Sequence, residues 1–241
     1  MRIQKYISQC GICSRREAEK KIEEGFVSVN GVPASIGQDV DPETDKVEVE
    51  GTFLRGAIND RVVLAMNKPK GCICSNADPF EAATVFDLVP EPFSKLKLFC
   101  CGRLDKNSRG LLILTNDGDF ANKVTHPSSG VVKRYHVQLN RALDPKIIPV
   151  LLRGVVCEGE KLKALKIIPD TTETQGAEKR VEVWLSQGRK REIRRMFEVM
   201  GYFVKELKRF QIGAYVLKGI PEGGVVVLGK ADRAKLLRDG I

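Results

Sequence analysis

Residues 102–118 read GRLDKNSRGLLILTNDG, in which a polar loop is followed by an apolar strand and then a turn. Glycines flank the loop, and the Leu111–Thr115 run has the composition of a buried strand. The pattern therefore places Asp105 at the end of a strand, where binding and catalytic side chains often lie. The competing interpretation is a turn aspartate that hydrogen-bonds its own backbone, and composition alone favours that interpretation.

The rest of residues 62–241 predicts strands interrupted by a few helices. Apolar or alternating runs predict strands at 62–66, 96–101, 111–115, 133–139, 162–168, 181–185, from 202 onward and at 225–228. Helices are predicted at 120–124, with Asp119 as the cap, at 145–152 and at 191–200. Strands outnumber helices and the two alternate irregularly. The predicted fold class is therefore α+β with a mixed sheet, rather than a doubly wound fold.

A smaller module precedes this domain. Ser14 and Glu17 have the spacing of a capping box, and Asn30-Gly31 between alternating segments predicts a type I′ hairpin. The charge also divides the chain, because residues 1–38 carry a net charge of +2, residues 39–50 carry −5 and residues 51–241 carry +12. We therefore predict a module of two helices and a short sheet at 1–50, a linker at 51–61 and the larger domain at 62–241.

The composition suggests an anionic partner. The 241 residues include 40 Lys and Arg against 31 Asp and Glu, a net charge of +9. No apolar run exceeds about five residues, against the ~20 of a membrane-spanning helix, and the N-terminus lacks a signal-peptide pattern. The seven cysteines are odd in number and their spacings do not favour a metal site. We expect a cytoplasmic protein with reduced thiols, no membrane span and no bound metal.

Basic side chains gather in two places. In the small module they are Arg2, Lys5, Arg15, Arg16 and Lys20, and they form either a solvated face or a phosphate-contacting patch. Residues 186–218 carry a net charge of +6, denser than a solvated face requires, which favours a nucleic-acid-binding surface. On a helical wheel of 191–200, Arg191 and Arg195 lie opposite the apolar stripe. Arg194 lies beside the stripe, where a half-buried guanidinium requires a carboxylate partner, either for function or as a structural salt bridge.

Several segments resemble known families. Residues 2–7, 11–18 and 25–31 resemble the S4 RNA-binding module in order and spacing. The larger domain is similar to the RNA pseudouridine synthases of the RsuA/RluB type at residues 63–71, 102–118, 133–137, 188–196 and 207–209. The resemblance covers nearly the whole chain, and 102–118 is its most specific motif. It implies an S4 module followed by a synthase domain whose mixed, mostly antiparallel sheet is flanked by helices.

The resemblance implies roles for four residues. Asp105 matches the catalytic aspartate, which attacks the uridine at the ribose C1′ as a nucleophile. Attack at C6 and a glycal route are alternatives. Tyr135 matches the tyrosine that stacks on the target base, with proton transfer as a second candidate role. Arg194 matches the basic residue that pairs with the aspartate and favours its ionised form. Leu207 matches an apolar residue of the same pocket. No cofactor is implied.

The resemblance also implies the partner, which is ribosomal RNA in an assembling subunit, bound by a monomer. The residues expected to contact RNA are Arg2, Lys5, Arg15, Arg16, Lys20, Asn30, Arg103, Arg189, Arg191 and Arg195. Small-subunit relatives often carry His-Gln where this chain has Arg191-Glu192, so the large subunit is favoured. One alternative is a catalytically silent RNA-binding or ribosome-assembly factor, which could lose Asp105 freely. The other is a tRNA-acting isomerase, which the S4 module disfavours.

Overall fold

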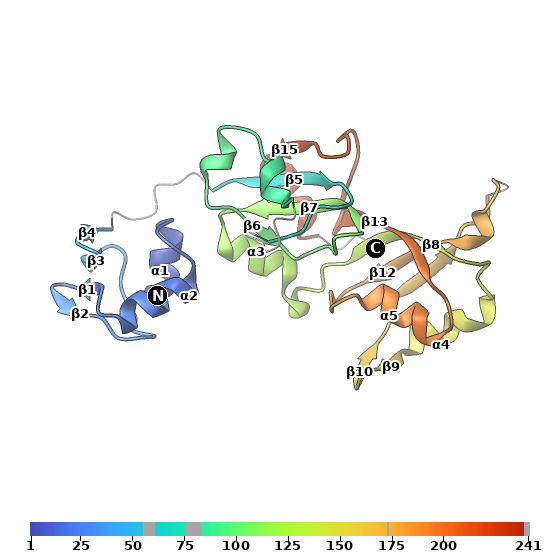
Figure 1. Cartoon of the computed structure of the whole chain (residues 1–241), viewed down its shortest axis with the longest axis horizontal. Helices are drawn as coiled ribbons and strands as arrows, with labels where there is room; N and C mark the ends of the chain where they lie inside the picture. Colours follow the sequence, from blue (N-terminus) through green and yellow to red (C-terminus); the bar gives the residue numbers. More distant parts are fainter. Residues whose placement is uncertain (55–60, 76–82, 173, 239–241) are drawn as a thin grey trace. The chain divides into compact units, whose positions relative to one another are not determined.

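The structure is a computed structural model that describes residues 1–54, 61–75, 83–172 and 174–238. The chain divides into two compact units (Figure 1). The first comprises Met1–Arg61 with Asn116–Gly118, and the second comprises Val62–Thr115 with Asp119–Ile241. Over the described ranges, no helix has the length and apolar character needed to cross a membrane.

The first unit contains two helices and a four-stranded antiparallel sheet. Its elements are α1 (Ile3–Gln9), α2 (Arg15–Glu23), β1 (Val27–Val29), β2 (Val32–Pro33), β3 (Val47–Val49) and β4 (Thr52–Phe53), with the strand order β2-β1-β3-β4. Apolar side chains from both helices pack on β1 and β3. β4 lies within the range predicted as a linker, and residues 55–60 of that range lie outside the described residues.

Two local predictions for this unit are confirmed. Ser14 Oγ accepts a hydrogen bond from Glu17 N at 3.3 Å, and Ser14 N donates to Glu17 Oε2 at 2.7 Å, which completes the capping box. Asn30 and Gly31 have φ of 51° and 82°, and a type I′ turn requires positive φ at both central residues. The hairpin then pairs Val29 with Val32, as the alternating sequence predicts.

The second unit is built on a nine-stranded sheet. Its main path runs through β11 (Lys166–Pro169), β12 (Arg180–Leu185), β8 (Lys133–Leu139), β13 (Val204–Ile212), β7 (Arg109–Thr115), β5 (Val63–Lys68) and β15 (Val225–Val227). In addition, β14 (Tyr215–Val216) pairs with β13, and β6 (Phe99–Cys101) pairs with β7. Among the described strands, β13 and β7 are parallel and the other neighbours are antiparallel. The predicted α+β class with a mixed, mostly antiparallel sheet is confirmed.

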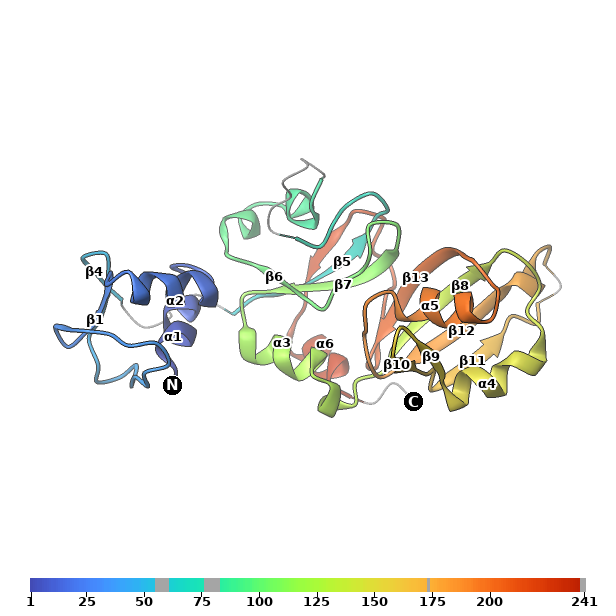
Figure 2. The same ribbon diagram turned by 60° about the horizontal axis from the view of Figure 1, so that its bottom comes forward.

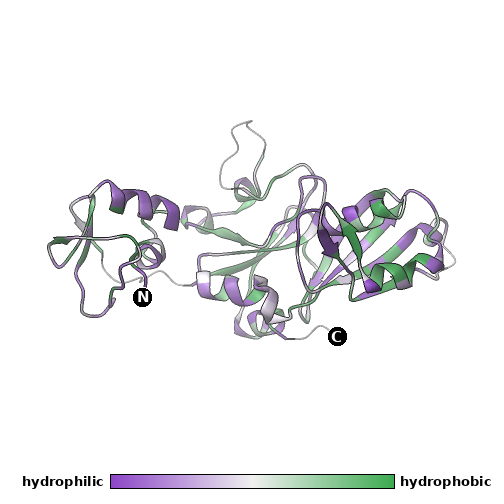
Figure 3. Cartoon of the chain, turned by 90° about the horizontal axis from the view of Figure 1, so that it is seen from below, coloured by the Kyte–Doolittle hydropathy of each residue, from purple (hydrophilic) through white to green (hydrophobic). Residues whose placement is uncertain are grey.

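Helices and short turns cover this sheet (Figure 2). α3 (Gly118–Thr125) and α6 (Lys230–Leu236) pack on apolar residues of β5 and β7. The other face of those two strands packs against η1 (Val85–Leu88) and its neighbours. α4 (Ile148–Arg153) and α5 (Glu192–Val199) pack over β8 and β12. In the hydropathy colouring of Figure 3, hydrophobic (green) and hydrophilic (purple) residues alternate along the strands and helices of the second unit.

Some predicted elements differ in the structure. The strand predicted at 162–168 is two strands, because β9 (Val155–Cys157) and β10 (Glu160–Leu162) form a separate hairpin while β11 pairs with β12. Its turn, Glu158-Gly159, has positive φ at both residues, and Glu158 is not a residue type that signals such a turn. The helix predicted at 145–152 begins as a 3-10 turn, η4 (Pro145–Ile147), before α4. α3 begins at Gly118, so Asp119 lies in its first turn rather than capping it.

Candidate active site

A buried lysine holds the loop that carries Asp105. Lys68 lies at the end of β5 and is 0% exposed, and burial lowers its pKa. Its Nζ donates, at 3.0, 3.2, 3.4 and 2.8 Å respectively, to the carbonyl oxygens of Pro69, Asp105, Lys106 and Ser108. Ser108 N in turn donates to Asp105 O at 2.9 Å. These bonds hold residues 105–108 against the end of β5 and so fix the position of the backbone at Asp105.

Strands β8 and β13 bring Tyr135 and Leu207 to one face of the sheet. Tyr135 is the register partner of Arg209, and Leu207 is the register partner of Val137. Directly paired residues of antiparallel strands project to the same face, and so do residues two apart on one strand. Tyr135 and Leu207 therefore lie on the same side, and each is 6% exposed.

Strand β7, which follows the Asp105 loop, lies very close to β13. Gly110 has a φ of +102°, and a Cβ built at this position would lie 2.1 Å from Arg209 O. A distance that short is impossible for a real side chain, so glycine permits the approach. A cavity of about 470 Å³ lies beside the Asp105 loop, β8 and β13. Its lining includes Asp105, Tyr135 and Leu207. Its size is within the range of small-ligand pockets, ~300–1,000 Å³.

The structure places Asp105 beside Arg194. Arg194 Nε lies 3.8 Å from Asp105 Oδ2, and the two side chains are 13% and 34% exposed. Arg194 Nη1 donates to Val204 O at 2.7 Å, which anchors the guanidinium, whereas Nε and Nη2 are buried without a hydrogen-bond partner among the described residues. Burial lowers the pKa of Arg194, and the charge of Asp105 opposes that shift. The contact is an ion pair longer than a hydrogen bond, which leaves donor capacity for a ligand.

Further basic residues line the cavity, including three of those predicted to contact RNA, which are Arg103, Arg189 and Arg191. Arg191 is exposed and has a φ of 51° at the start of α5. Arg189 N donates to Glu192 Oε2 at 3.0 Å, and Arg189 Nε donates to Gln187 Oε1 at 2.9 Å. The cavity is therefore bordered by guanidinium groups, as an anionic ligand requires.

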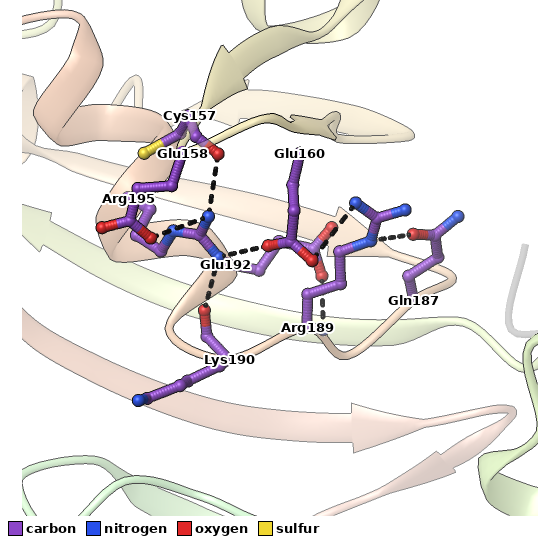
Figure 4. Close-up of polar contacts among 8 residues, drawn as sticks. All are labelled: Cys157, Glu158, Glu160, Gln187, Arg189, Lys190, Glu192 and Arg195. Carbon is purple, nitrogen blue, oxygen red and sulfur yellow. Dashed lines mark hydrogen bonds and ion pairs between the residues drawn. The ribbon is translucent and has the colours of Figure 1, made fainter.

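Arg195 has different surroundings (Figure 4). Its guanidinium lies 2.6 Å from Glu160 Oε2 and 3.2 Å from Glu158 Oε2, and it donates to Cys157 O at 2.9 Å. The helical wheel places Arg195 on the solvent side of α5, but its side chain is only 12% exposed because the β9–β10 hairpin covers that side. The hydrogen bond to Glu160 is the largest of the interactions that raise the pKa of Arg195.

The first unit presents the remaining basic residues predicted to contact RNA. They lie on or next to α1 and α2 and are Arg2, Lys5, Arg15, Arg16 and Lys20. Arg15 and Arg16 are exposed on the first turn of α2. Arg2 ion-pairs with Asp39 at 3.4 Å, and Lys20 ion-pairs with Glu24 at 3.5 Å. Ion pairs this exposed are weak, so these cations are able to exchange a carboxylate for a phosphate.

Asn30 has a structural part in the same unit. Its Oδ1 accepts from Lys46 N at 2.9 Å, and its Nδ2 donates to Asp45 Oδ1 at 2.9 Å. These two bonds tie the β1–β2 turn to the segment before β3. An RNA contact by Asn30 stays a prediction.

Sequence reasoning assigned no role to three buried cations, which are Lys68 under the Asp105 loop and Lys133 and Arg209 in the cavity lining. Lys68 belongs to the 63–71 motif, but the apolar run that ends there gives no sign of its four carbonyl contacts. Lys133 precedes Tyr135 by two residues on an alternating strand, and this spacing was the available signal that both face the cavity. Arg209 depends on the pairing of β13 with β8, which no local pattern predicts.

Comparison with known proteins agrees with this geometry. The family model for RNA pseudouridylate synthase matches residues 62–199, and the S4 domain model matches residues 1–46. A solved structure described as a pseudouridylate synthase superposes with a TM-score of 0.70 at 29% identity, covering 98% of this chain and 99% of that one. The chain belongs to the RNA pseudouridine synthase family and is therefore an isomerase that carries an S4 RNA-binding module.

Within that family the chain is similar to two known enzymes. It is 39% identical to the dual-specificity RNA pseudouridine synthase RluF of Escherichia coli (strain K12) over 92% of this chain and 73% of that protein. It is 36% identical to the ribosomal large subunit pseudouridine synthase B of Pseudomonas aeruginosa over 90% of this chain and 56% of that protein.

Proposed function

We propose that this enzyme converts one uridine of large-subunit ribosomal RNA to pseudouridine, with Asp105 as the nucleophile. The ion pair between Asp105 and Arg194, beside a cavity lined by Tyr135 and Leu207, is the observation that carries this assignment. The names of the relatives and the Arg191-Glu192 sequence support the large subunit as the source of the RNA.

The chemistry follows from what the isomerisation must accomplish. A carboxylate oxygen of Asp105 forms a bond to the ribose C1′ while the bond from C1′ to N1 of uracil breaks, and the electron pair leaves with the ring. After the ring rotates, C5 attacks C1′ and the carboxylate leaves with its own electron pair. The proton lost from C5 is balanced by the proton gained at N1, so the reaction needs no oxidant or co-reactant.

The remaining side chains bind and orient the nucleotide. The uridine must leave its stack to reach Asp105, and a flipped base is stabilised by an aromatic face such as that of Tyr135. Leu207 completes the apolar wall and limits the water around the ion pair. Arg194 pairs with Asp105 and orients its carboxylate. The arginines at the border of the cavity and the basic residues of the S4 module hold phosphates by charge.

Carbodiimide labelling of pseudouridine followed by reverse transcription tests the proposal. Ribosomal RNA is mapped from cells with the gene, without it, and with Asp105→Asn, an uncharged substitution of the same shape. We expect one large-subunit signal to disappear in the deletion strain and to return with the wild-type gene but not with Asp105→Asn. The matched control is Asn107→Ala in the same loop, which restores the signal because Asn107 is exposed and carries no assigned role.

The alternative functions give different maps. A catalytically silent assembly factor predicts an unchanged ribosomal map together with altered subunit profiles. A tRNA-acting isomerase predicts a signal lost from tRNA. Either result would overturn the ribosomal assignment, and restoration by Asp105→Asn would overturn the role of the aspartate alone.

A further inference from the structure

The cavity contains positive charge that the Asp105–Arg194 pair does not use. Lys133 on β8 and Arg209 on β13 line it together with Asp105 and Tyr135, and they are only 8% and 3% exposed. Lys133 and Tyr135 are two residues apart, and Tyr135 is the register partner of Arg209. The three side chains therefore project from one face of the sheet.

Hydrogen bonds within the protein use only some of the donors of these two cations. Arg209 Nε donates to Leu111 O at 2.7 Å, but its Nη2 is buried and has no hydrogen-bond partner among the described residues. Lys133 Nζ donates to Ser186 O at 3.3 Å. Both acceptors are neutral carbonyls, which orient a cation but do not neutralise it. A buried donor without an acceptor is unfavourable, so the site suits a ligand that brings an anionic oxygen.

Besides Asp105, which pairs with Arg194, the carboxylate of Glu192 lines this cavity. Glu192 is 4% exposed, and its Oε2 already accepts from Arg189 N at the start of α5. Burial and the charge of Arg209 lower the pKa of Lys133 to about 8, while the charge of Glu192 acts in the opposite direction. The balance of charge at this site is therefore positive and partly uncompensated.

We propose that Arg209 and Lys133 are catalytic residues that bind the carbonyl oxygens of the target uracil and stabilise the negative charge of the ring once its bond to ribose breaks. This inference rests on the proposed function. A flipped base enters the buried part of a pocket while the RNA backbone stays at its rim, which favours the base over a phosphate as the occupant.

The proposed role fits the step at which negative charge forms on uracil. When C1′–N1 breaks, the electron pair spreads over N1, O2 and O4 of uracil, and it is withdrawn from the ring when C5 bonds to C1′. Donors that are fixed before the reaction and shielded from water stabilise such a transient charge more than they stabilise the neutral substrate. They therefore raise the rate more than they raise the affinity for RNA.

The first experiment separates rate from binding. Transcripts of the large-subunit RNA are saturated with wild-type enzyme, Arg209→Gln or Lys133→Met, and single-turnover rates are measured beside filter-binding affinities. We expect each substitution to slow the reaction by about 10²–10³-fold, while Kd changes by less than about threefold. Lys208→Gln is the matched control, because Lys208 adjoins Arg209 but faces the other side of β13, and its rate should equal that of wild type.

The second experiment tests whether the substitution slows the step in which uracil leaves C1′ as an anion. Transcripts made with 5-fluorouridine place an electron-withdrawing atom on the ring, which stabilises the anion without help from the protein. Consumption of fluorouridine, measured by mass spectrometry of nuclease digests, should show a rate deficit for Arg209→Gln about tenfold smaller than with uridine. A variant that is merely misfolded would lose the same factor on both substrates, and Arg209→Lys, which keeps the charge, should recover part of the rate.

The outcomes separate this inference from the proposed function. A large-subunit RNA map that stays unchanged in the deletion strain would overturn the proposed function and this inference with it. An active wild type with an unchanged Arg209→Gln rate, or with equal deficits on uridine and fluorouridine, would overturn the inference alone.

Discussion

Two buried lysines of the second unit have contrasting surroundings. Lys68 donates to four carbonyl oxygens and holds the Asp105 loop, whereas Lys133 has one neutral carbonyl and a cationic neighbour, Arg209. Desolvation lowers the pKa of both lysines, and for Lys133 the charge of Arg209 adds to that shift. The extent to which Lys133 destabilises the folded protein therefore depends on whether its side chain is protonated.

This dependence gives a prediction for stability against pH. Lys133 has a folded pKa of about 8 and an ordinary value of 10.5, so between these values the unfolded chain holds a proton that the folded chain has lost. The contribution of Lys133 to the free energy of unfolding then rises with pH, by at most about 3 kcal/mol. We expect Lys133→Met to be more stable than wild type at pH 7 and to lose most of that advantage by pH 10. Urea unfolding of both proteins at the two pH values checks this, and a constant difference would contradict it.

At the scale of elements, α5 and the β9–β10 hairpin determine the surroundings of the arginines. The sequence predicted α5 within one residue at each end, because its apolar residues recur at helical spacing. The wheel also placed Arg194 beside the buried stripe, where it meets Asp105. The hairpin was missed because its turn uses Glu158, so the surroundings of Arg195 could not be predicted. Helix faces and the Asn30-Gly31 hairpin were predictable from local sequence, whereas pairing between strands far apart in the chain, such as β13 with β8, was not.

Arg195 and Arg191 should therefore respond differently to the same substitution. Arg195→Met removes a cation held by Glu158, Glu160 and Cys157 O, so we expect a melting temperature lower by a few degrees and an unchanged salt dependence of RNA binding. Arg191→Met removes an exposed cation at the cavity, so we expect unchanged stability and a salt slope smaller by about 0.7–0.9. Thermal melts and binding from 50 to 200 mM salt measure both, and a reduced slope for Arg195→Met would show that it contacts RNA.

At the scale of the whole molecule, the positive charge is unevenly distributed. The first 38 residues carry a net +2, the next 12 carry −5, and the rest of the chain carries +12. The S4 module therefore has a small basic surface on its helices, while most of the excess positive charge belongs to the catalytic unit. Binding energy from phosphates should come from both units, in proportion to their exposed cations.

The contribution of the S4 module can be measured separately. Arg15→Ala combined with Arg16→Ala removes two exposed cations from the start of α2, so we expect weaker RNA binding and a salt slope smaller by about 1.4–1.8. Lys146→Ala combined with Lys163→Ala is the control of equal charge, because both lysines are exposed and lie away from the residues lining the cavity. Equal slopes for the two double variants would show that the α2 cations form a solvated face.

Gly110 has a consequence for how this enzyme tolerates mutation. The Asp105 loop precedes β7, whereas Leu207 and Arg209 belong to β13, and the two strands meet where Gly110 faces Arg209 O. The spacing between Asp105 and the β13 side of the cavity therefore depends on the absence of a side chain at Gly110. Even alanine at this position would push the two walls apart while leaving every functional group in the chain. A variant at Gly110 could thus abolish the reaction with no change in the chemistry of any side chain that touches the RNA.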